Sequence, residues 1–180
     1  MKSAIGPLRI NLTRVVIVRA LEAALVSGLA FYIGRLIALE FHGGTAMVGA
    51  WWAAMSGLIV LEGKAAEVAG FALRQVGGNF IGATVGGLGL LFFPHDIPAL
   101  GLVVLLIVLC CNVLGMSRQA GLASAAAIVI CGVSLMSSEI PPLLNAFLRF
   151  VESAIGLSLA VAVVFAVRLA ERALFGASHR

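Results

Sequence analysis

The sequence predicts an all-α protein, a polytopic membrane bundle of six transmembrane helices. Three observations predict this class. Of the 180 residues, 62% are hydrophobic and 11% are charged, whereas soluble domains carry roughly 25% charged residues. The mean hydropathy is +1.14. The apolar residues form continuous runs of membrane-spanning length, which favours helices over the alternating segments of a β-barrel.

Six apolar runs follow one another along the chain, separated by short polar or proline-containing turns. We expect spans over residues 15–39, 45–61, 70–93, 99–116, 120–137 and 143–170. The turns contain residues that end helices or resist burial in hydrocarbon: Gly43, Gly44, Glu62, Lys64, Pro94, Asp96, Pro98, Arg118, Glu139, Pro141 and Pro142. The expected organisation is a basic leader (1–14), one six-helix module (15–170) and a short tail (171–180).

The third run is unusually rich in glycine, at positions 77, 78, 82, 86, 87 and 89. In a helix exposed to water, each interior glycine costs about 1 kcal/mol relative to alanine. In a bilayer, glycines instead let neighbouring helices approach closely. The pattern therefore favours a position for the third span at the centre of the bundle.

The basic residues predict the orientation of the chain in the membrane. The leader, the second turn, the fourth turn, their flanks and the tail hold Lys2, Arg9, Arg14, Lys64, Arg74, Arg118, Arg168, Arg172 and Arg180. The first, third and fifth turns contain no lysine or arginine. Because basic loops stay in the cytoplasm, both termini are predicted to be cytoplasmic. The first span is not a cleaved signal peptide, since Arg19 and Glu22 interrupt it.

A short internal similarity predicts a 3+3 inverted repeat. Gln75 precedes an Ile-Gly pair that ends at Gly82, and Arg149 precedes one that ends at Gly156, at the same spacing. Each segment lies in the third span of a three-span half. Halves with an odd number of spans are inverted relative to each other, as in many transporters. Chance similarity between two helices rich in small residues is the alternative.

Two pairs of opposite charge lie inside predicted spans: Arg19 with Glu22, and Arg149 with Glu152. Their i,i+3 spacing lets the two side chains meet on one helix face. Charges within the bilayer are costly and usually functional. One interpretation is mutual neutralisation that fixes helix register. The other is a polar pathway, in which the arginines bind an anion and Glu22 or Glu152 carries protons.

Other candidate site residues lie in the second and third spans. Arg74 lies at the cytoplasmic mouth of the third span, and Asn79 one turn further in could donate a hydrogen bond to a bound oxyanion. Trp51 and Trp52 could pack in the bundle or at its interface. They could instead provide a stacking surface for an aromatic substrate.

Several function classes are excluded by what the sequence lacks. The three cysteines form no CxxC pattern, and no His/Cys/Asp/Glu cluster has metal-ligand spacing. No GxSxG or phosphate-loop motif occurs. We therefore expect no enzyme activity, no cofactor and no metal. The net charge of +4 reflects basic residues at span ends and does not indicate nucleic-acid binding.

The motifs resemble a known family. They are Trp51-Trp52-Ala-Ala, Gly63-Lys64, the run from Leu73 to Gly86, Arg118, and Arg149 to Gly156. Together they are similar to the transmembrane module of the fusaric acid resistance and aromatic acid exporter family. That superfamily also resembles the plant aluminium-activated malate transporters.

The resemblance implies a transporter in the bacterial inner membrane that exports organic, often aromatic, carboxylates and is driven by the proton gradient. It also implies at least two modules, hence a homodimer or a second module, because one six-helix unit is half of a typical member. One departure concerns Gln75, which holds the place of a family arginine, while Arg74 is displaced by one residue. A passive anion channel and a structural or regulatory membrane subunit are the alternatives.

Overall fold

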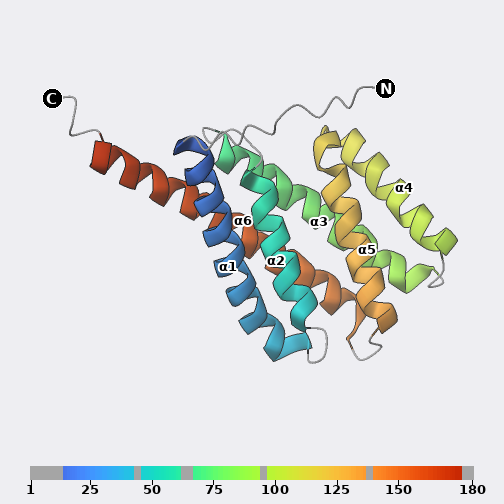
Figure 1. Cartoon of the computed structure of the whole chain (residues 1–180). Coiled ribbons are helices and arrows are strands. Elements are labelled where there is room, and N and C mark those ends of the chain that lie inside the picture. Colours follow the sequence, from blue (N-terminus) through green and yellow to red (C-terminus); the bar gives the residue numbers. More distant parts are fainter. Residues whose placement is uncertain (1–13, 43–45, 62–66, 94–96, 137–139, 176–180) are drawn as a thin grey trace, which may run out of the picture.

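The computed structural model describes residues 14–42, 46–61, 67–93, 97–136 and 140–175, and it confirms the predicted all-helical bundle (Figure 1). The helices are α1 (Arg14–His42), α2 (Ala46–Leu61), α3 (Val68–Phe92), α4 (Ile97–Val113), α5 (Ala120–Met136) and α6 (Pro142–Phe175). A short 3₁₀ turn, η2 (Ser117–Gln119), leads into α5. Each helix begins and ends within a few residues of a predicted span, except that α6 continues to Phe175.

The helices differ in their ability to cross a bilayer by length alone. Four are long and apolar enough: Val15–Phe41, Val68–Phe92, Ser117–Met136 and Pro142–Ala173. The other two, α2 with 16 residues and α4 with 17, are apolar but shorter. Since a helix rises 1.5 Å per residue, they extend about 24 and 26 Å, a little less than the roughly 30 Å hydrocarbon core.

Helix α6 holds the bundle together. It packs against α1, α2, α3 and α5, and in Figure 1 it runs obliquely behind the others, antiparallel to α3. The α1–α2 pair lies on one side and the α4–α5 pair on the other. Apolar clusters fill both sides: one is built around Val26, Val60, Leu157 and Val164, and another around Val103, Ile107 and Cys111.

Small residues set how closely these helices approach. A Cβ on Gly156 of α6 would overlap the carbonyl oxygen of Ala53 in α2, and a Cβ on Gly82 of α3 would overlap that of Ala123 in α5. Backbones in such contact tolerate only glycine, which is how close helix packing is achieved in membranes. The predicted central position of the glycine-rich span is therefore observed, since α3 packs against α4, α5 and α6.

Parts of the predicted organisation lie outside the described residues. They include residues 1–13 of the leader, the turn with Glu62 and Lys64, and the turn with Asp96. The helix α6 enters the segment predicted as a tail and ends at Phe175. The described part of the chain thus consists of the helices that position the site.

Candidate functional site

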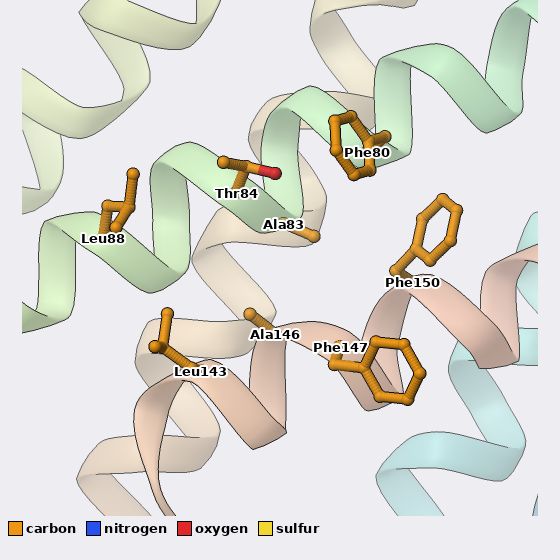
Figure 2. Close-up of a pocket in the computed structure, with 8 residues that line it drawn as sticks. All are labelled: Phe80, Ala83, Thr84, Leu88, Leu143, Ala146, Phe147 and Phe150. Carbon is orange, nitrogen blue, oxygen red and sulfur yellow. The ribbon is translucent and has the colours of Figure 1, made fainter.

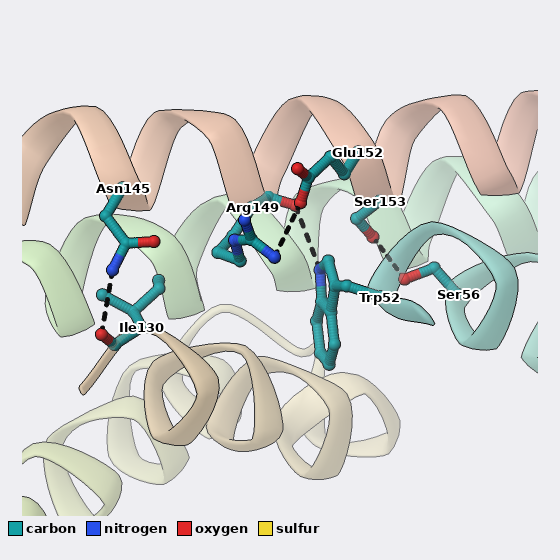
Figure 3. A network of polar contacts seen from close by, with 7 residues as sticks. All are labelled: Trp52, Ser56, Ile130, Asn145, Arg149, Glu152 and Ser153. Carbon is teal, nitrogen blue, oxygen red and sulfur yellow. Dashed lines mark hydrogen bonds and ion pairs between the residues drawn. The ribbon is translucent and has the colours of Figure 1, made fainter. Parts of the chain in front are cut away.

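The centre of the site is an ion pair on α6. The Nη1 atom of Arg149 lies 3.0 Å from the Oε2 atom of Glu152, and both side chains are fully buried. The i,i+3 spacing places both groups on the same face of the helix, as the sequence predicts. Figure 3 shows this face turned toward α2, α3 and α5. Arg149 is the largest fully buried side chain in the described chain.

Helix α2 encloses the pair through Trp52 and Gly49. Trp52, 3% exposed, donates a hydrogen bond from Nε1 to the carbonyl oxygen of Arg149, with a length of 3.0 Å (Figure 3). A Cβ on Gly49 would overlap the Oε1 atom of Glu152. Gly49 therefore makes room for the carboxylate, and the indole of Trp52 fixes the turn of α6 that carries the arginine.

Beside the ion pair, three helices meet through a polar chain. Asn79 of α3 donates a hydrogen bond from Nδ2 to Ser153 Oγ on α6. Ser153 in turn donates to Ser56 Oγ on α2, at 3.0 Å (Figure 3). All three side chains are buried. Since hydrocarbon supplies no hydrogen-bond partners, these two hydrogen bonds give the serine hydroxyl groups the partners they need inside the bundle.

Asn145 continues the polar face of α6 toward the first residues of that helix. Its Nδ2 atom donates to the carbonyl oxygen of Ile130 at 3.0 Å and to Ser134 Oγ at 3.1 Å, both on α5 (Figure 3 shows the first). The asparagine is fully buried. It joins α5 to α6 one turn before Arg149.

The second predicted ion pair is also formed. The Nη1 atom of Arg19 lies 3.1 Å from the Oε2 atom of Glu22 on α1. The glutamate is buried, but the arginine side chain is 36% exposed. The two pairs therefore differ in environment: the Arg19 charge reaches the surface of the bundle, whereas the Arg149 charge does not.

Two predicted site residues are not brought to the buried pair. Trp51 is 55% exposed and lies on the outer face of α2, next to the inward-facing Trp52. Arg74 is exposed on α3, while its neighbour Gln75 is 3% exposed. The inward position that precedes Gly82 by seven residues thus belongs to Gln75, as its place in the family pattern indicates.

The sequence reasoning missed several buried polar residues: Ser56, Gln75, Asn145 and Ser153. A periodic signal was available for them. Asn145, Arg149, Glu152, Ser153 and Gly156 follow the spacing of one helix face, and so do Gln75, Asn79 and Gly82. Extending each face from its charged or glycine member would have found Gln75, Asn145 and Ser153, but not Ser56 on α2.

The arrangement holds a buried cation beside a buried carboxylate, and among the described residues no group of three His, Cys, Asp or Glu side chains could hold a metal ion. A guanidinium has five donors in a planar fork and suits a carboxylate. In a low-dielectric interior, one carboxylate can replace another at this cation. Glu152 is the resident partner that such an exchange would displace.

The fold and the buried pair define a multi-pass membrane protein with charged chemistry in its interior. Residues 25–163 match the family described as Fusaric acid resistance protein-like. The match covers most of the chain, and the chain belongs to that family, as its motifs predicted. The family indicates a membrane transporter. Neither the comparison with curated proteins nor the comparison with solved structures gave a match.

Proposed function

We propose that this protein is a secondary, proton-coupled transporter of organic, aromatic carboxylates and binds them at Arg149. The observation that carries the proposal is the fully buried Arg149–Glu152 pair. Replacing a buried ion pair with apolar residues is often neutral or stabilising. A purely structural role therefore gives little reason to retain this pair inside an apolar bundle, whereas anion binding requires it.

The pair suggests how substrate and proton are coupled. When Glu152 is ionised it neutralises Arg149 and occupies its donors. Protonation of Glu152 leaves the guanidinium without its counter-charge, so that a substrate carboxylate binds in its place. Departure of the substrate and loss of the proton restore the pair. The substrate on Arg149 and the proton on Glu152 thus bind together and leave together.

The neighbouring side chains fit the same function. The proposed roles are a hydrogen bond from the Asn79 amide to the substrate and contact of the Trp52 indole with its ring. Asn79 now donates to Ser153, and Trp52 contacts the α6 backbone beside Arg149. Trp51, Arg74, Arg19 and Glu22 lie away from the pair, and we assign them to the approach of substrate and protons.

The proposed setting is the bacterial inner membrane, with all six helices inserted and both termini in the cytoplasm. The asymmetry of the basic residues supports this orientation. We also propose a homodimer. Small residues recur every fourth position on α6 at Ala154, Ser158 and Ala162, where they line a surface groove, and Ser158 also lines a second one. Small residues at this spacing allow a second helix to pack closely.

The test of the proposed function is flux through the purified protein in proteoliposomes. Labelled benzoate is supplied with an imposed pH gradient, and uptake is followed with and without an uncoupler. Protein-free liposomes are measured in parallel, because neutral benzoic acid crosses lipid unaided. We expect faster accumulation than in these liposomes, and we expect the uncoupler to abolish it. Equilibration that ignores the pH gradient would instead identify a passive anion channel. No flux of any tested acid through folded protein would contradict transport and favour a structural subunit.

A further inference from the structure

Buried polar side chains line α3 and α6 in two rows that join at the hydrogen bond from Asn79 to Ser153, and most of them play no part in the ion pair. We call the two rows together the polar seam; its members are Gln75 and Asn79 on α3, and Asn145, Arg149, Glu152 and Ser153 on α6. Each is at most 3% exposed. The seam is therefore closed to the surface of the bundle in this conformation.

The seam extends through much of the membrane depth. At 1.5 Å per residue, Gln75 lies about 10 Å and Asn79 about 16 Å from the start of α3. On the antiparallel α6, Arg149 lies about 10 Å and Ser153 about 16 Å from its start. Because Asn79 donates to Ser153, the two rows join near the middle of the roughly 30 Å core.

Three oxygens along the seam have no hydrogen-bond partner among the described residues: Gln75 Oε1, Asn79 Oδ1 and Asn145 Oδ1. A buried acceptor left unpaired costs about 1–3 kcal/mol, and lipid supplies no donor. All three atoms are acceptors. They fit a ligand that donates hydrogen bonds, such as water, and they do not fit an ionised carboxylate, which has no proton to donate.

We propose that the polar seam is a water-binding path inside a single subunit, with Gln75 and Asn79 connecting Glu152 to the end of the bundle where α3 begins. Buried waters occur where at least two polar partners are available, and the two amides lie one helical turn apart. The path has a use only if the proposed transport function holds, because it would bring protons to Glu152. Its existence can be measured without any substrate.

The experiment is cysteine labelling in membrane vesicles of both orientations. The three native cysteines are first replaced by alanine, and Gln75→Cys, Asn79→Cys and Ser153→Cys are introduced singly. A charged, membrane-impermeant methanethiosulfonate is added. The matched control is Phe80→Cys, because Phe80 follows Asn79 at the same depth but is 58% exposed, at a surface pocket between α3 and α6 where it lies against Phe150 (Figure 2).

We expect labelling from the side where α3 begins, during the openings of the bundle that let water enter and leave the path. The thiol reacts as thiolate, which forms in water and not in lipid, so the seam cysteines should react about tenfold or more faster than the control. Ser153→Cys changes a single atom and keeps the test valid if an amide variant fails to fold. Equal rates at the seam positions and Phe80→Cys, or no labelling from either side, would overturn the proposal. A path confirmed in protein that moves no benzoate would leave the inference standing and remove only the proposed substrate.

Discussion

The two halves of the molecule, α1–α3 and α4–α6, pack through corresponding helix contacts but carry different buried polar side chains. Gly156 of α6 packs on Ala53 of α2, and Gly82 of α3 packs on Ala123 of α5. Thus the third helix of each half crosses the second helix of the other half at a glycine–alanine contact. The contact between α2 and α6 is therefore the counterpart of the contact between α5 and α3, and both are extensive. This correspondence supports the predicted 3+3 inverted repeat, which stays a proposal.

The difference between the halves lies one turn before these contacts. In α6 the polar group is Glu152, which fits against Gly49 of α2. In α3 the corresponding residue is Gly78, and the larger side chain at this contact is that of Gln119, the last residue of η2. Arg149 of α6 precedes Gly156 by seven residues, and Gln75 of α3 precedes Gly82 by the same number, so these two residues also occupy corresponding positions. One architecture therefore holds an ion pair in one half and uncharged amides in the other, which indicates that packing does not require the charges.

The largest expected loss of stability comes from removing one partner of the buried ion pair, Arg149. Arg149→Met leaves Glu152 buried without its partner, and we expect a loss of about 3–5 kcal/mol in stability together with loss of transport. Gln75→Met at the corresponding position removes only a neutral amide and should cost much less. Thermal unfolding in detergent measures both. Equal losses for the two variants would contradict the distinction between the halves.

The glycine–alanine contacts are expected to respond alike. Gly156→Leu and Gly82→Leu each drive a side chain into a backbone carbonyl, so each should destabilise the fold by about 3 kcal/mol or more. Gly132→Leu is the control, because a Cβ there meets nothing within 4 Å. The readout is the yield of monodisperse protein on size-exclusion chromatography. Tolerance of either leucine would refute close packing at that crossing.

Substitutions of the two tryptophans should have different effects, because Trp52 donates a hydrogen bond to α6 and Trp51 lies on the outer face of α2. Trp52→Phe removes the donor to the Arg149 carbonyl, with an expected loss of about 1 kcal/mol and a raised KM for the substrate. Trp51→Phe, on the outer face, should leave both quantities unchanged. The comparison uses unfolding midpoints and concentration-dependent uptake. A larger effect at Trp51 would place the substrate on the outer face of α2.

The smallest effect is expected at the second ion pair. Because Arg19 is 36% exposed and lies near the first residues of α1, where a long side chain can reach the polar interface, Arg19→Gln should cost much less stability than Arg149→Met. The same unfolding assay measures it beside Arg149→Met. A loss as large as that of Arg149→Met would mean that the two pairs are equally buried in the membrane.

The helices and the ion pairs could be predicted because each depends on local sequence. Long apolar runs end at proline, glycine or charged turns, and the i,i+3 spacing of Arg149 and Glu152 fixes their contact within one helix. The choice between Arg74 and Gln75 depends on the helix face as a whole. Neighbouring residues on a helix point about 100° apart, and Gln75 shares the buried face of α3 with Asn79 and Gly82, whereas the charge of Arg74 alone pointed to the wrong residue.

The contacts between helices were beyond the reach of sequence periodicity. The hydrogen bond from Asn79 to Ser153 joins residues in two different halves, and Trp52 reaches a backbone carbonyl of α6. Each requires the three-dimensional crossing of helices. Trp51 and Trp52 are residues of the same type and are adjacent in the sequence, yet only Trp52 faces the bundle interior.

The most direct test of the central claim compares uptake by the wild type with uptake by Glu152→Gln in proteoliposomes. Glutamine keeps the size of the side chain but cannot take up or release a proton. If Glu152 couples substrate to protons at Arg149, the wild type should accumulate labelled benzoate under a pH gradient faster than protein-free liposomes do. The variant, recovered as monodisperse protein, should not exceed these liposomes. Equal, uncoupler-sensitive accumulation by both proteins above the level of protein-free liposomes would contradict the claim.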